Sequence, residues 1–186
     1  MNSVGGAHRQ AAVLVRAAQK AGWGRAMAKD VGLGIASTFG QERTMPTWIA
    51  CAARVRVDRA NGRVAVEKLT LVIDAGTIVH PDSAAAQVEG AALWGLSTAL
   101  YEGTEFTKGQ PRDTNLDSYR VLRMGETPEM DIEFIPSTET PVGLGEPATT
   151  AVAPAIGNAI FAATGARVRD LPIRPQAVLA ALARVA

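Results

Sequence analysis

The sequence has little cysteine, little histidine and few aromatic residues. Its 186 residues include a single cysteine, Cys51, two histidines, His8 and His80, and 5% aromatic residues. One cysteine excludes an internal disulfide, a four-thiolate zinc site and an iron–sulfur cluster held by this chain alone. Two histidines are too few for an imidazole-rich metal centre. We therefore expect Cys51 to be a small core residue, and we expect no metal ion to be bound directly by protein side chains.

Charged residues are also sparse, at 20% against 47% hydrophobic residues, a balance that excludes disorder and favours a packed core. The net charge of +1 hides an uneven distribution. Segment 1–63 carries 10 basic and 3 acidic residues, segment 64–163 carries 5 and 14, and segment 164–186 carries 4 and 1. Basic ends without interleaved aromatic residues or a recognition motif do not predict nucleic-acid binding. They indicate a solvated surface or a face that meets an acidic partner.

Long hydrophobic runs are missing as well. The longest uncharged run, 147–166, is interrupted by Pro154, Gly157 and polar residues, so we expect no membrane span. The apolar stretch Ala11–Val15 is followed at once by Arg16 and does not have the pattern of a signal peptide. We expect the cytoplasm as the default location, or the periplasm if a partner carries the export signal.

Hydrophobic periodicity predicts an α+β fold in which a mixed, mainly antiparallel sheet packs with several helices. Asn61 and Gly62 predict a hairpin with a type I′ turn, and Pro154 predicts a kink or an interruption of its helix. In the first helix, an apolar stripe includes Ala12 and Leu14, and the second strand alternates as if one face were buried. The expected helices span 8–21, 81–101, 147–163 and 175–185, and the expected strands span 31–38, 47–58, 63–74 and 130–135.

The segment Gly143–Ala148 reads Gly-Leu-Gly-Glu-Pro-Ala and formally matches a dinucleotide-binding fingerprint. A polar loop precedes it in place of a buried strand, and Pro147 removes a backbone N–H that would face pyrophosphate, so a Rossmann fold is not favoured. The two glycines would still let a large ligand approach the backbone closely. Glu146 has two interpretations: its carboxylate caps the helix that begins at Pro147, or it points into a pocket as a general base.

Gln87 and Gly90 lie three residues apart in the second predicted helix and so share a face. A glycine in a helix interior costs about 1 kcal/mol relative to alanine, so a close contact is expected at Gly90, and helix packing is the simplest explanation. We expect His80 to be a loop residue. Trp23 and Trp94 are expected to be packing residues.

These features occur together with other short segments in a fixed order. The segments are His8–Gln10, Val13–Gly24, Val72–Gly76, His80–Pro81, Gln87–Gly90, Asn115–Arg120, Gly143–Pro147, Ala153–Gly165 and Leu171–Pro172. In this combination the chain resembles the C-terminal part of the molybdopterin-binding large subunit of the xanthine dehydrogenase/aldehyde oxidase family. The branch that it resembles most is the isoquinoline 1-oxidoreductase beta subunit.

The resemblance implies a molybdenum hydroxylase that oxidises an N-heterocycle or an aldehyde. In such enzymes a water-derived oxygen is inserted into the substrate and hydride passes to a sulfido ligand of molybdenum. Glu146 would be the general base. Gln87 would bind the phosphates or the dinucleotide tail of the cofactor, and Gly143 and Gly145 would let the backbone approach it.

The resemblance also implies partners. The molybdenum would be held by molybdopterin, in the cytosine dinucleotide form, and iron–sulfur clusters would lie only on a separate small subunit. Residues 1–186 would be the C-terminal portion of a molybdopterin-binding domain that shares its cofactor with the remaining portion of the large subunit. The alternative is a non-catalytic fragment or assembly module that retains only the fold. An uncovered interface predicts self-association of the isolated chain.

Overall fold

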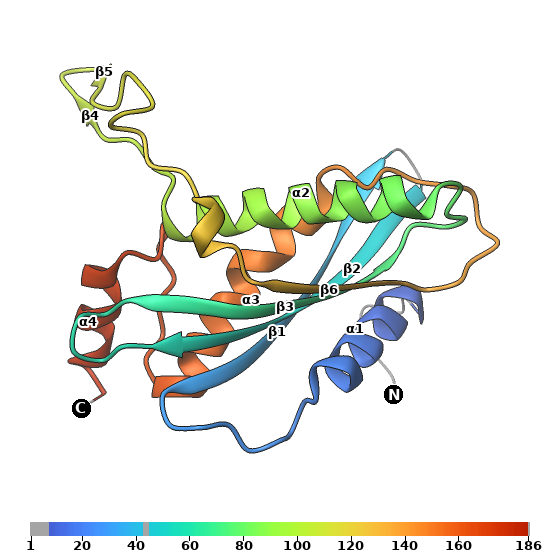
Figure 1. The fold of residues 1–186 in the computed structure, drawn as a ribbon, viewed down its shortest axis with the longest axis horizontal. Coiled ribbons are helices and arrows are strands. Elements are labelled where there is room, and N and C mark those ends of the chain that lie inside the picture. The colour runs from blue at the N-terminus through green and yellow to red at the C-terminus, as the bar shows by residue number, and fades with distance from the viewer. Residues whose placement is uncertain (1–7, 43–44, 186) are drawn as a thin grey trace.

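Four strands form the central sheet of the computed structural model, which describes residues 8–42 and 45–185 (Figure 1). They are β1 (Val31–Glu42), β2 (Met45–Val57), β3 (Val64–Asp74) and β6 (Glu129–Phe134), in the order β1-β2-β3-β6. The β1–β2 and β2–β3 pairs are antiparallel, whereas β3 and β6 are parallel. The α+β prediction with a mixed, mainly antiparallel sheet is therefore confirmed.

Helices cover both faces of this sheet. Helix α1 (His8–Ala21) packs on one face, and α3 (Pro147–Thr164) packs on the other with α2 (Pro81–Leu100) against it. Helix α4 (Pro175–Leu182) lies beside the turn that joins β2 to β3. Figure 1 shows the small hairpin of β4 (Phe106–Thr107) and β5 (Gln110–Pro111) projecting away from the sheet, before the short helix η1 (Met124–Glu126).

Strand β2 is buried on both faces at Ala50 and Ala52, which corrects the expectation of one buried face there. Farther along the strand, Arg54 and Arg56 leave the second face open to solvent, as expected. Cys51 and its alternating neighbours pack beneath α3, while Ala50 packs with Val13 and Ala17 of α1. The alternation along the strand could not reveal the second face, because small alanines there read as neutral. The buried stripe of α1 is likewise centred on Val13 and Ala17, and Ala12 is exposed.

Strand β1 and helix α3 approach until their backbones touch. A Cβ placed on Gly34 would lie 2.1 Å from the backbone nitrogen of Ala159 and 2.3 Å from the carbonyl oxygen of Ala155. The Asn158 side chain also donates a hydrogen bond to the carbonyl of Ile35, at 2.9 Å. Glycine is therefore required at position 34 by space.

Two turn and helix predictions differ from the structure. Asn61 and Gly62 do mark a hairpin, but only Gly62 has a positive φ, so the turn is not type I′. Instead, the Asp58 carboxylate accepts hydrogen bonds from the Ala60 backbone N–H and the Asn61 amide. Helix α3 runs without interruption through Pro154. Pro154 and the residue four positions earlier are exposed, so water can bind the carbonyl that proline leaves free.

Ion pairs join α1 to the outer strand β6. Glu133 accepts hydrogen bonds from the Arg16 guanidinium at 2.6 Å and from the Lys20 ammonium at 3.0 Å. The Arg16 guanidinium lowers the pKa of Glu133 below its ordinary value. The charged form of Glu133 thus stabilises the folded state.

Replacing Glu133 with glutamine should therefore lower the free energy of unfolding at about pH 7 but not in acid. A carboxyl group whose pKa is lowered in the folded state stabilises the fold at pH values above its unfolded-state pKa of about 4.3. It loses that effect as the pH falls. Urea unfolding of the wild type and of Glu133→Gln across this pH range measures the difference between their free energies of unfolding. The exposed Glu89, substituted in the same way, is the control and should show no such dependence. A difference in the free energy of unfolding that persists in acid would contradict the prediction.

Candidate active site

Glu146 occupies the N-cap position of α3, at the end of the loop that follows β6. Its backbone is in the α region, with φ −106° and ψ −32°, and its side chain makes no capping hydrogen bond. The residue is exposed. Of the two interpretations of Glu146, capping is therefore not observed, and the carboxylate remains available to a ligand.

The Glu146 carboxylate borders a groove of about 410 Å³. The wall opposite the loop comes from the end of β1 and the beginning of β2, where Phe39 contacts Trp48 in a tilted arrangement with ring centroids 5.1 Å apart. The described residues that border the groove are Thr38, Phe39, Gly40, Thr47, Val142, Gly143, Glu146, Pro147 and Thr150, and Glu146 is the one among these that carries a charge. The groove therefore combines a carboxylate with hydroxyl groups and an aromatic wall.

The loop that carries Glu146 is tied to the ends of β2 and β3. The backbone N–H of Thr77 donates to the Glu139 carbonyl at 2.8 Å, and that of Val142 donates to the Ala75 carbonyl at 3.0 Å. Nearer to Glu146, the Thr47 hydroxyl donates to the Gly143 carbonyl at 2.6 Å. These ties hold an otherwise irregular segment in place.

A partly buried ion pair lies at the end of β3, next to the same region. The Asp74 side chain is almost fully buried and accepts hydrogen bonds from Arg9 at 2.7 and 2.6 Å and from the Gly76 backbone N–H at 3.2 Å. Gly76 has a φ of +72°, and a Cβ there would lie 2.1 Å from the carbonyl oxygen of Thr140. The end of β3 and the Glu146 loop therefore lie in close backbone contact.

Gln87 lies next to Gly145 but outside the Glu146 groove. A Cβ placed on Gly145 would lie 3.3 Å from the amide nitrogen of Gln87, and both residues are exposed. The structure thus brings Gln87 and Gly145 together and places Gly143 and Glu146 in the groove. It does not place Gln87 on the groove wall.

His80 lies outside the helix, as expected, and is the N-cap of α2, where its Nδ1 accepts a hydrogen bond from the Ser83 N–H at 3.2 Å. Three other expectations, for Gly90, Trp94 and Trp23, are corrected. A Cβ added to Gly90 would have no neighbour within 4 Å among the described residues. Trp94 is 61% exposed and Trp23 is 53% exposed, so neither is a packing residue. The side of α2 that meets α3 carries Gly95 instead.

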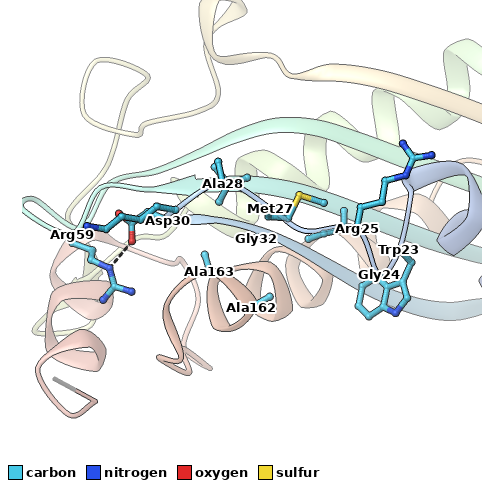
Figure 2. Close-up of a pocket in the computed structure, with 13 residues that line it drawn as sticks. Trp23, Gly24, Arg25, Met27, Ala28, Asp30, Gly32, Arg59, Ala162 and Ala163 are labelled. Atoms are coloured by element: carbon cyan, nitrogen blue, oxygen red, sulfur yellow. Dashed lines mark hydrogen bonds and ion pairs between the residues drawn. The ribbon is translucent and has the colours of Figure 1, made fainter.

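A larger groove, of about 840 Å³, lies elsewhere, between the α1–β1 loop and the C-terminal part of α3 (Figure 2). Figure 2 shows Asp30 and Arg59 at one end and Trp23 and Arg25 at the other. Asp30 and Arg59 pair with each other at 2.6 Å, which leaves no unpaired carboxylate among the described residues that line this groove. The larger volume therefore does not by itself identify the active site, and the Glu146 groove is the better candidate for it.

The residues around Gly145 suit a large cofactor with polar groups. Across residues 8–42 and 45–185, neither the Gln87 amide nor the Glu146 carboxylate is engaged in a side-chain hydrogen bond. The exposed backbone at Gly145 can be approached closely, since it carries no side chain. In the same described part of the chain, no three His, Cys, Asp or Glu side chains gather into a group that could hold a metal ion. Nor does any described helix have the length and apolar character needed to cross a membrane.

Structural comparison gives the class of domain. The fold is similar to that of the aldehyde oxidoreductase from Desulfovibrio gigas, with a TM-score of 0.67 and 30% sequence identity over 74% of this chain and 16% of that chain. The structure is therefore a domain of the kind found in aldehyde oxidoreductases.

Sequence comparison identifies the family. Residues 5–128 match the molybdopterin cofactor-binding domain. The chain is 59% identical over 182 residues to the membrane-bound aldehyde dehydrogenase [pyrroloquinoline-quinone] of Gluconacetobacter polyoxogenes, covering 97% of this chain and 24% of the relative. It is 31% identical over 167 residues to the beta subunit of the isoquinoline 1-oxidoreductase of Brevundimonas diminuta, covering 90% and 21%. The chain belongs to the molybdopterin cofactor-binding domain family of aldehyde- and xanthine-type oxidoreductases, as the resemblance predicted. It spans about a quarter or less of the length of these relatives.

Thr47 and Phe39 border the groove but carried no signal in the sequence. Both lie about a hundred positions before Glu146, and only the pairing of β1 with β2 brings them to the loop. Their position follows from the register, in which Gly40 pairs with Thr47 and Phe39 with Trp48. Sequence reasoning without that register could not have selected them.

Proposed function

We propose that this chain is the C-terminal portion of the molybdopterin-binding large subunit of a molybdenum hydroxylase, with Glu146 as its general base. The observation that carries the proposal is the exposed, uncapped carboxylate of Glu146 at the mouth of a groove, in a chain of this family. When bound, the cofactor supplies the redox chemistry that converts the substrate to a product containing an oxygen from water.

The residues of this chain would bind the cofactor and move a proton. The Gln87 amide can donate hydrogen bonds to phosphate oxygens, and the exposed backbone at Gly143 and Gly145 leaves room for a large ring system to approach. Glu146 can accept a proton at its carboxylate oxygen, which requires that it be ionised at the working pH and within hydrogen-bond reach of the donor.

We propose an aldehyde as the substrate and an N-heterocycle as the second possibility. The relative that is 59% identical is named as an aldehyde dehydrogenase, whereas the relative named for isoquinoline is 31% identical. Two relatives are named as subunits, one of isoquinoline 1-oxidoreductase and one of nicotinate dehydrogenase, which supports partners for this chain as well. We propose the rest of the large subunit and an iron–sulfur small subunit as those partners.

We propose the cytosine dinucleotide form of molybdopterin, shared with the rest of the large subunit, and iron–sulfur clusters on the small subunit only. The location would be the cytoplasm, or the periplasm with an export signal on a partner. The isolated chain would self-associate through the surface that the rest of the large subunit covers.

Reconstitution tests the proposal. The chain is produced together with the rest of the large subunit and the iron–sulfur subunit, and the purified complex is analysed for molybdenum, pterin and pyrroloquinoline quinone, and for aldehyde oxidation with a dye acceptor. We expect stoichiometric molybdenum and pterin, no pyrroloquinoline quinone, and activity that disappears when the chain is left out. A complex that keeps its molybdenum and activity without the chain would support the assembly-module alternative. A complex with the quinone and no molybdenum would overturn the proposal.

A further inference from the structure

Among the described residues, the buried hydroxyl of Thr47 makes the last side-chain hydrogen bond to the loop before Glu146. Its Oγ1 donates to the Gly143 carbonyl at 2.6 Å, and the residue is 1% exposed. We infer that Thr47 is a positioning residue, which sets the direction of the Glu146 carboxylate by fixing Gly143. This inference rests on the proposed role of Glu146 as a base.

Only two residues separate the fixed carbonyl from Glu146. Leu144 is partly buried against the main hydrophobic core, whereas Gly145 is exposed and has no side chain to restrain it. The next tie, from Val142 to β3, lies on the far side of Gly143. Without the Thr47 bond, the glycine-rich bend would keep its apolar contact but lose the polar contact that orients it.

Thr47 itself lies in the paired part of β2. It pairs with Gly40 at the meeting of β1 and β2, and a Cβ on Gly40 would lie 2.9 Å from the ring of Pro147, the residue after Glu146. The loop therefore contacts the β1–β2 pair on both sides of Glu146, through Gly143 before it and through Pro147 after it. A displacement of about 1 Å at a catalytic group can reduce the rate by about a hundredfold, so this constraint has a measurable consequence.

Substitution by valine or by serine distinguishes the role of the Thr47 hydroxyl from the role of its branched shape. Thr47→Val keeps the branched shape and removes the donor, whereas Thr47→Ser keeps the donor and removes a methyl group. In the reconstituted complex, we expect Thr47→Val to lower kcat between about tenfold and a hundredfold with KM within about twofold of wild type. Thr47→Ser should stay within about threefold of wild type in both constants.

Hydrogen exchange of the chain provides a second readout that does not depend on the cofactor. The amide of Val142, which donates to the Ala75 carbonyl and lies next to Gly143, should exchange faster in Thr47→Val than in wild type, while Thr47→Ser should match wild type and the amides of β3 should be unchanged in both variants. If Thr47→Val does not fold, Thr47→Ala is measured in the same two ways, with the same results expected.

The outcomes separate this inference from the proposed function. Wild-type kcat and wild-type exchange in the variant without the hydroxyl would overturn the positioning role, even if Glu146 proves essential. Equal losses in Thr47→Ser and Thr47→Val would also overturn it, because the methyl group and not the hydroxyl would then matter. An active Glu146→Gln complex would instead overturn the proposed function, and the exchange measurement would still report whether Thr47 orders the bend.

Discussion

Replacing Glu146 with glutamine is expected to lower kcat of the reconstituted complex by about a thousandfold, the range in which a general base contributes. Glutamine has the same shape but cannot accept the proton. The carboxylate is exposed and makes no capping bond, so the fold and the cofactor content should be unaffected. Steady-state kinetics with a dye acceptor, together with molybdenum analysis of the same preparation, measure both quantities.

Glu139→Gln is the matched control for this experiment. Glu139 lies in the same loop and is also exposed, but it does not border the groove, and its contacts with the loop are made by its backbone N–H and carbonyl. We expect its kcat to stay within about twofold of wild type, because its side chain has no part in the proposed reaction. Full turnover in Glu146→Gln, with molybdenum present, would remove Glu146 from the mechanism.

Replacing Gly34 with alanine is expected to destabilise the chain by about 3 kcal/mol or more, at the upper end of what overpacking costs. The added Cβ would lie 2.1 Å and 2.3 Å from backbone atoms of α3, which a side-chain rotation cannot relieve. Strand β1 and α3 would have to separate, and the buried residues between them would lose contact. Urea unfolding of the isolated chain measures the effect.

Gly90→Ala is the opposite case and serves as the control. Gly90 lies in the interior of α2, is exposed and has no neighbour within 4 Å of a Cβ among the described residues. Alanine should therefore stabilise the helix, by about 0.5 to 1 kcal/mol. If Gly34→Ala unfolded at the same urea concentration as wild type, the close approach of β1 and α3 would be wrong.

The sequence predicted the elements well where the signal was local. Helix α1 has the expected bounds, His8–Ala21, because Gly22 ends it, and α2 and α3 begin at Pro81 and Pro147 as the prolines indicated. Predictions failed where tertiary contacts decide. The second buried face of β2 depends on α1, and the continuity of α3 through Pro154 depends on which side of the helix meets water.

The residues of the candidate site also divide into those that the sequence could identify and those that it could not. Glu146 at a glycine-lined bend before a helix could be identified along the chain, and the structure places it beside a groove. The opposite wall could not, because Phe39 and Thr47 reach the bend only through the pairing of β1 with β2. The neighbouring position of Gln87 and Gly145 also depends on how α2 packs on α3, which no local pattern encodes.

The single cysteine has a practical consequence for anyone who handles this protein. Cys51 lies wholly inside, between the sheet and α3, and burial raises the pKa of its thiol to about 12. Alkylating reagents act on the thiolate, so labelling must wait until the helix lifts from the strands. The rate of labelling with a maleimide therefore measures how often this interior opens. No introduced probe is needed, and no second thiol contributes to the signal.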